Sequence, residues 1–187
     1  MDDLQQFEAF MRAYQDMVFG TAVRLVGNVA EAQDIAQEVF LKAFERYGDI
    51  GRSPTVGGWL KTVTRNLALN HLTRYRARWS FFSELGPPGE ENHDALADLP
   101  APDLAADHWD AEARRQWVDA GLAKLPPAQR VPLVLYHFED LGYEEIAERL
   151  NISLSKVKTD IHRGRDALRR HLARANIRPE GYDTEEH

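Results

Sequence analysis

The fold of this chain is decided by the stretch GYEEIAERLNISLSKVKTDIHR, residues 142–163. Its first part places Ile146 and Leu150 on one side of a helix. Asn151 tolerates the left-handed backbone that closes such a helix, and Ser153 is a favourable N-cap for a second one. The pattern therefore predicts two helices joined by a tight turn, which is the build of a helix-turn-helix DNA-binding motif.

The second of these helices has two unlike faces. Apolar residues and one glycine recur at helical spacing on the inward face: Val157, Ile161, Gly164, Leu168 and Leu172. The opposite face is polar and carries Ser155, Thr159, His162, Arg163 and Asp166, flanked by Lys156 and Lys158. Polar side chains near a helix N-terminus suit base edges, and Lys or Arg suit phosphates. Taken alone, the pattern also fits a solvated basic helix at the end of a bundle.

Charge is distributed unevenly along the 187 residues, whose net charge of −7 is unusual for a nucleic-acid-binding protein. Residues 59–78 hold five bases and no acid, and residues 153–172 hold six bases and two acids. Residues 79–112 hold nine acids and no Lys or Arg. Two basic elements are thus separated by an acidic connector, which an average charge conceals.

Several classes of function are disfavoured by composition. No stretch is apolar and long enough to cross a membrane, and the acidic N-terminus lacks the order of a signal peptide. The chain has no cysteine, which excludes disulfides and thiolate catalysis and favours a cytoplasmic location. Its seven histidines form no i, i+4 ligand pair, and there is no phosphate-binding loop or nucleophile motif. We therefore expect no enzyme activity, no metal and no cofactor.

Helical spacing along most of the chain predicts an all-α fold of two small domains. The first domain is expected over residues 4–78 and the second over residues 108–175. Residues 79–107 between them are rich in Pro, Ala, Asp and Glu, which is typical of a flexible acidic linker. Residues 176–187 are expected to form a frayed acidic tail.

Individual helices are predicted from the same spacing. The first has apolar positions at Phe7, Phe10, Met11, Tyr14 and Val18 and reaches a turn signal at Gly27-Asn28. The second covers residues 31–47 and has a core face of Ile35, Val39, Phe40, Ala43 and Phe44. A loop over residues 48–58, with four glycines and Pro54, leads to a helix over residues 59–78. Helices resume at about residue 108, break at Pro126-Pro127, and continue over residues 128–139 before the helix-turn-helix.

Three segments together resemble a known family. They are DIAQEVFLKAF at residues 34–44, WLKTVTRNLALNHL at residues 59–72, and LPPAQR at residues 125–130 leading into the helix-turn-helix. In this order and spacing they are similar to bacterial sigma factors of the extracytoplasmic-function (ECF) group, the minimal two-domain members of the sigma-70 family. The resemblance covers nearly the whole chain. It implies a sigma region 2 bundle, a helix-turn-helix sigma region 4, and a function in initiating transcription.

The resemblance also implies roles for individual residues. Docking on the clamp of core RNA polymerase falls to Asp34, Gln37, Glu38 and Lys42, whose mixed polar surface suits basic and polar partner groups. Recognition and melting of the −10 element fall to Arg52, Ser53, Lys61, Arg65, Asn66, Asn70 and Arg74. Recognition of the −35 element falls to Ser155, Lys156, Lys158, Thr159 and Arg163. Expected partners are core polymerase, through its clamp and flap, promoter DNA and an anti-sigma factor.

Three positions depart from the family pattern. Asp160 stands where relatives usually carry a base, and helical geometry places it on a flank where it faces a phosphate or pairs with Lys156 or Arg163. Asn70 stands where many relatives have Asp. The loop over residues 51–58 lacks the usual acidic and aromatic residues, which puts the −10 base preference in doubt.

Two other kinds of protein fit parts of the sequence. A transcription regulator that binds an operator without core polymerase would explain residues 128–172. It would not explain the helix around Asp34, the basic helix over residues 59–78 or the acidic linker over residues 79–107. A further alternative is an interaction protein that mimics a sigma factor and sequesters its anti-sigma factor. Such a protein would not need basic residues that face DNA.

Overall fold

A computed structural model describes residues 3–83 and 111–174 of the chain, and every regular element within these ranges is a helix. The prediction of an all-α fold is confirmed. The chain divides into two compact units, residues 1–95 and residues 96–187, each of which is described by itself. The tail over residues 176–187 and most of the expected linker lie outside the described residues. Among the described helices, none is long and apolar enough to cross a membrane.

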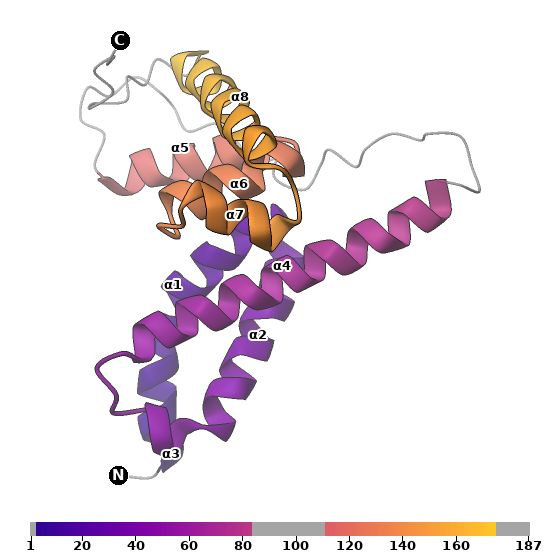
Figure 1. Ribbon diagram of the computed structural model, residues 1–187. Coiled ribbons are helices and arrows are strands. Elements are labelled where there is room, and N and C mark those ends of the chain that lie inside the picture. The colour runs from indigo at the N-terminus through magenta and orange to yellow at the C-terminus, as the bar shows by residue number, and fades with distance from the viewer. Residues whose placement is uncertain (1–2, 84–110, 175–187) are drawn as a thin grey trace. The chain divides into compact units, whose positions relative to one another are not determined.

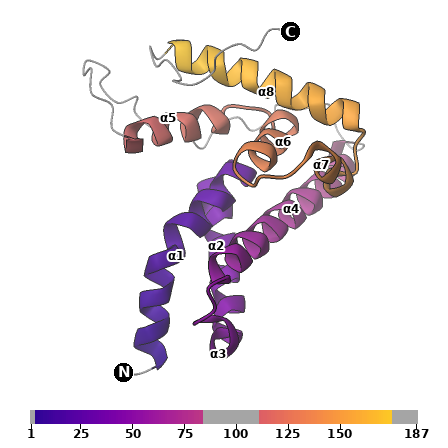
Figure 2. The ribbon, with the colours of Figure 1, turned by 60° about the vertical axis from the view of Figure 1, so that its left-hand side comes forward.

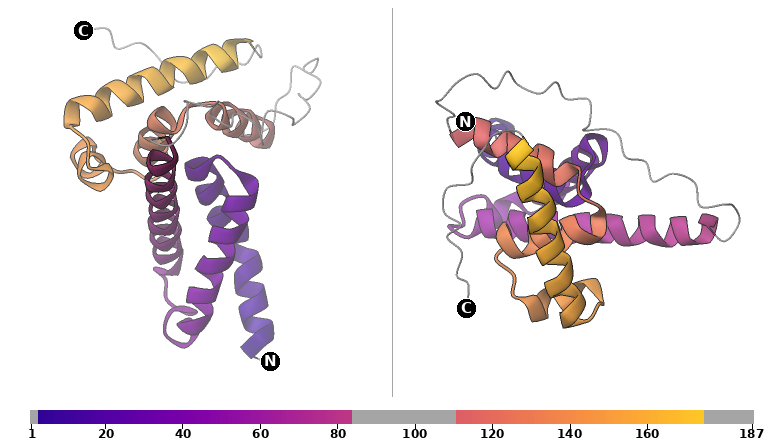
Figure 3. Two further views of the ribbon diagram at one scale, coloured as in Figure 1. Left: turned by 90° about the vertical axis from the view of Figure 1, so that its right-hand side faces the viewer. Right: turned by 90° about the horizontal axis from the view of Figure 1, so that it is seen from above.

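The first unit is built from three long helices and one short one: α1 (Asp3–Val26), α2 (Val29–Glu45), α3 (Tyr47–Ile50) and α4 (Val56–Ser83). Helices α1, α2 and α4 pack against one another as a bundle (Figure 1; Figure 3, left). Val18, Leu25, Val39 and Leu60 have no exposed surface and form the centre of this core. The apolar stripes of the sequence therefore meet in one place.

The turn between α1 and α2 follows from two residues. Gly27 adopts a positive φ of 73°, a backbone conformation that favours glycine. Asn28 then caps α2, because its side-chain oxygen accepts a hydrogen bond from the Glu31 amide at 3.1 Å. The turn predicted at these two residues is confirmed.

Helix boundaries in the first unit differ from the prediction in three places. Helix α2 covers Val29–Glu45 rather than residues 31–47, because Asn28 caps it. Residues 48–58 are not wholly a loop, because α3 ends at Ile50 and α4 begins at Val56. Helix α4 also ends at Ser83 rather than at residue 78. The physical reason is that no Gly or Pro interrupts residues 79–83, and the first such breakers follow at Gly86 and Pro87.

Two apolar side chains assigned to buried faces are exposed in the structure. Met11 lies at the surface of α1, and Phe44 on α2 is 54% exposed. The Phe44 ring keeps an edge contact with Phe7, with ring centroids 4.9 Å apart. The assignment was wrong because the neighbouring helices cover a narrower stripe than the one that helical spacing marks.

The second unit holds α5 (Ala111–Ala123), α6 (Pro127–His137), α7 (Tyr143–Leu150) and α8 (Leu154–Arg174). Helix α8 crosses the other three and contacts each of them (Figure 2; Figure 3, right). Its crossing of α6 is close, since a Cβ atom added at Gly164 would lie 3.2 Å from the Gln129 carbonyl oxygen. The glycine in the apolar series of α8 thus permits the helices to approach.

The segment LPPAQR joins α5 to α6. Pro127 occupies the first turn of α6, where its missing amide hydrogen costs nothing. Arg130 is buried, and its guanidinium donates to the Leu125 carbonyl oxygen at 3.0 Å across the turn. This arginine therefore fixes the end of α5 against the start of α6.

Candidate DNA- and polymerase-binding surfaces

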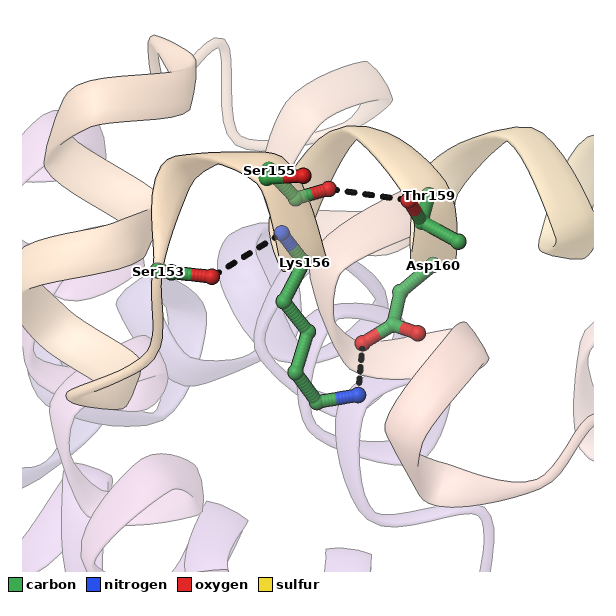
Figure 4. A network of polar contacts seen from close by, with 5 residues as sticks. All are labelled: Ser153, Ser155, Lys156, Thr159 and Asp160. Carbon is green, nitrogen blue, oxygen red and sulfur yellow. Dashed lines mark hydrogen bonds and ion pairs between the residues drawn. The ribbon is translucent and has the colours of Figure 1, made fainter.

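The turn between α7 and α8 has the geometry that the sequence predicted. Asn151 is left-handed, with φ 52° and ψ 50°. The amides of Ile152 and Asn151 donate back to the carbonyl oxygens of Ala147 and Glu148, at 3.0 and 3.2 Å, and close the end of α7. Ser153 then caps α8 by accepting the Lys156 amide at 3.2 Å (Figure 4). Local hydrogen bonds therefore fix where α8 begins.

The two faces of α8 separate as expected. Val157, Ile161, Gly164 and Leu172 are buried on the inward face, and Leu168 is partly buried. Ser155, Thr159, His162 and Arg163 are exposed on the other face. The Thr159 hydroxyl donates to the Ser155 carbonyl oxygen at 2.9 Å, which orients that side chain at the surface (Figure 4). The outward face of the helix thus presents hydroxyl groups and basic side chains together.

Asp160 lies on one flank of α8. Its carboxylate is 2.8 Å from the Lys156 ammonium, so the predicted pairing with Lys156 is confirmed. The structure thus takes this alternative rather than the one in which Asp160 faces a phosphate, because the Asp160 side chain is only 6% exposed. Its neighbour Ile161 belongs to the core, and Asp160 lies at the border of that buried face.

An aromatic stack supports the other flank. The rings of Tyr136 and Tyr143 are parallel within 9° and their centroids lie 4.7 Å apart. The Arg165 guanidinium lies 5.4 Å from the Tyr136 centroid, and the Lys158 ammonium lies 5.9 Å from that of Tyr143. Sequence reasoning missed this stack, because the two tyrosines come from different helices and share no periodic pattern.

Proton equilibria are shifted beside this stack. Desolvation lowers the pKa of His137, and the charge of Arg165 lowers it further. The neutral ring is then able to accept the Arg165 Nε–H, at 3.0 Å from His137 Nε2. The hydrogen bond with Tyr136 is the largest cause that raises the pKa of Tyr143. Arg165 is thereby held in place by the His137 ring and the face of Tyr136.

The residues assigned to the −10 element lie on α4 and the loop before it. Asn66, Asn70 and Arg74 are exposed and follow one another at i, i+4 spacing along one row of α4. Lys61 is half-buried. Arg65 is 8% exposed, which counts against its assignment to a backbone phosphate. Two asparagines and one arginine therefore form the accessible part of this set on α4.

The loop before α4 is braced by its own hydroxyls. Arg52 is exposed. The Ser53 hydroxyl lies 2.9 Å from that of Thr55 and accepts the Thr55 amide at 3.3 Å. These bonds form a local turn of the kind that Ser and Thr favour. A DNA base captured at this loop would meet a preformed turn in which the Ser53 hydroxyl is already hydrogen-bonded.

The residues assigned to polymerase docking share the outer face of α2. Asp34, Gln37, Glu38 and Lys42 are all exposed, and Lys42 Nζ lies 3.6 Å from Glu38 Oε1. Leu41 lies one helical turn from Gln37 and Glu38 and is 65% exposed. Together with Phe44, it adds an apolar part to a polar surface, as protein–protein interfaces do. The sequence reasoning had not used Leu41.

Taken together, a helical bundle with a mixed apolar and acidic face and a separate helix-turn-helix unit define a two-domain DNA-binding protein. Comparison with protein families refines this class. Residues 10–78 match the family model of sigma-70 region 2, and residues 115–168 match that of sigma-70 region 4. The chain belongs to the sigma-70 family.

An ECF sigma factor among its relatives places the chain in the ECF group of that family. The chain is 31% identical over 172 residues to the ECF RNA polymerase sigma factor SigW of Bacillus subtilis, covering 91% of this chain and 90% of the relative. It is 32% identical over 168 residues to the RNA polymerase sigma-H factor of Pseudomonas aeruginosa, covering 89% and 86%. A solved structure of the sigma factor RpoE with the anti-sigma factor NepR from Bartonella quintana aligns with a TM-score of 0.49 at 19% identity, covering 89% and 96% of the two chains.

Proposed function

We propose that this chain initiates transcription by binding core RNA polymerase through α2 and directing it to promoters through α4 and α8. The observation that carries the proposal is that sigma-70 regions 2 and 4 occur together in one chain, in the family's order. The protein supplies binding energy and position, and the polymerase supplies the chemistry. We expect it to act in the cytoplasm, where its polymerase and promoters are.

The proposed role of the second unit is to read the −35 element. Helix α8 enters the major groove with its N-terminal turns, as the second helix of such motifs does. Ser155 and Thr159, which are exposed there, meet base edges. Lys158 and Arg163, also exposed, contact phosphates on either side of the groove. The unit would also contact the polymerase flap, by resemblance to the family.

The proposed role of the first unit is to dock on polymerase and open the −10 element. Asp34, Glu38 and Leu41 lie on one exposed face of α2 and meet the clamp. Asn66 and Asn70 on α4 offer donors and acceptors to unstacked bases, and Arg74 follows the backbone. Opening a duplex costs a few kcal/mol, roughly, which captured bases offset through stacking and hydrogen bonds.

Regulation by an anti-sigma factor is part of the proposal. Before polymerase binds, the docking face of α2 and the reading face of α8 both present exposed polar side chains. A protein that covers both faces would block polymerase and DNA at once. We therefore expect a cognate anti-sigma factor to compete with core polymerase for the chain.

Reconstituted transcription tests the proposal. Core polymerase from the source bacterium is mixed with the chain and a pool of genomic fragments, and the 5′ ends of the transcripts are mapped. We expect defined start sites that share two upstream elements and that vanish without the chain. If active polymerase yields no chain-dependent start sites while the chain alone protects DNA from cleavage, the operator-binding regulator is the better account.

A further inference from the structure

An ion pair within α8 joins two residues one helical turn apart. The Nζ atom of Lys156 lies 2.8 Å from Oδ2 of Asp160, and Figure 4 draws this ion pair as a dashed line. The Asp160 side chain is 6% exposed, whereas that of Lys156 is 52% exposed. The carboxylate is thus buried beneath the DNA-facing surface, while the ammonium that neutralises it lies at that surface.

We propose that Asp160 withdraws Lys156 from phosphate binding and thereby lowers the number of phosphate contacts that the DNA-reading helix makes. The inference rests on the proposed function of α8. A buried carboxylate is costly without a partner, so a Lys156 ammonium that moved to a phosphate would leave Asp160 uncompensated. A phosphate has to compete with Asp160 for Lys156, so its contact with Lys156 adds little binding free energy.

Lys158 provides an internal comparison two residues further along α8. It is exposed and carries the same charge, but its ammonium lies over the Tyr143 ring, 5.9 Å from the centroid, and pairs with no carboxylate of residues 3–83 or 111–174. An aromatic ring attracts a cation without cancelling its charge. Lys158 keeps a full positive charge for a phosphate, whereas Lys156 and Asp160 together are neutral.

The ion pair changes how the free energy of DNA binding is divided between phosphate contacts and base contacts. Phosphate contacts supply most of the affinity for DNA of any sequence, and base contacts supply the discrimination. A neutralised Lys156 removes one phosphate contact and leaves the base contacts of Ser155 and Thr159 unaffected. Asp160 therefore lowers the affinity for DNA of any sequence, and a larger share of the remaining binding free energy comes from the base contacts.

The experiment titrates the full chain against a fluorescein-labelled DNA duplex of scrambled sequence over a series of salt concentrations. The matched variants are Lys156→Gln and Lys158→Gln, because each removes one charge from the same helix and Gln still donates a hydrogen bond. Each phosphate contact adds about 0.9 to the slope of log K against log salt. We expect Lys158→Gln to reduce the slope by about that amount and Lys156→Gln to leave it unchanged.

Asp160→Asn supplies the reverse test. It keeps the size of the side chain and removes its charge, so Lys156 becomes free to bind a phosphate. We expect the slope to steepen by about 0.9 and the affinity for scrambled DNA to rise several-fold. Adding Lys156→Gln to Asp160→Asn should return both values to those of the wild-type chain. A purely structural role for Asp160 would not produce this reversal.

Three outcomes would overturn the inference. The first is a loss of slope in Lys156→Gln as large as that in Lys158→Gln. The second is no gain of slope in a folded Asp160→Asn variant. Thermal unfolding checks the folding of every variant, because Lys156→Gln leaves the buried Asp160 carboxylate without its partner; if Lys156→Gln does not fold, the comparison of Asp160→Asn with the double variant decides. The third is an absence of duplex binding by the wild-type chain at low salt. That result would refute DNA reading by α8 itself, and the inference with it.

Discussion

At the scale of single residues, the conformation of Asn151 decides how α7 meets α8. Its φ of 52° lies in the left-handed region, which costs most L-residues about 1 kcal/mol or more. We predict that Asn151→Ala lowers the free energy of unfolding of the second unit by about 1 kcal/mol, measured by urea titration. Asn151→Gly should be close to neutral, because glycine adopts this conformation freely. Equal destabilisation by both would show that the side chain, not the backbone, matters here.

Arg163 tests the reading face at the same scale. It is exposed on α8, and its expected contact is with a backbone phosphate. Arg163→Ala should weaken binding to duplexes carrying the −35 element by about tenfold and lower the salt slope by about one. Arg170→Ala, at an exposed position two turns further from the reading end, is the matched control. Equal losses in both variants would indicate a general charge effect rather than a contact.

At the scale of elements, α2 combines acidic and apolar groups on one exposed face. We predict that Asp34→Ala with Glu38→Ala weakens polymerase binding at least tenfold, and that Leu41→Ala weakens it several-fold, by loss of interface contacts. All three side chains are exposed, so the thermal midpoint should change little. Fluorescence titration with labelled core polymerase measures the affinity, and Asp16→Ala on α1 is the control. Full affinity in the doubly substituted protein would refute the docking assignment.

The elements also show what a sequence can predict. The turn at Asn151 and Ser153 follows from backbone preference and capping, which act within a few residues, and the prediction is confirmed. The inward series on α8 likewise follows from periodicity. The exposure of Phe44 and the burial of Asp160 and Arg65 depend on which helix lies opposite, so spacing alone does not predict them. The Tyr136–Tyr143 stack joins two helices and leaves no local signal.

At the scale of the whole molecule, a further prediction concerns the acidic linker over residues 79–107, of which residues 84–107 lie outside the described structure. By resemblance to the family, we expect residues 79–107 to thread through polymerase toward the path of the RNA. Replacing the acids within residues 90–107 by Ser should alter the yield of full-length transcripts while promoter binding is unchanged, measured by run-off transcription and footprinting in parallel. Unchanged initiation would reject a role for these charges.

Association with polymerase is the property on which the whole account depends, because the operator-binding alternative does not require it. The direct measurement is size-exclusion chromatography of the purified chain mixed with bacterial core RNA polymerase at low and moderate salt. The account predicts stable co-elution, which Asp34→Ala with Glu38→Ala should weaken. Clean separation of the two proteins even at low salt would contradict it.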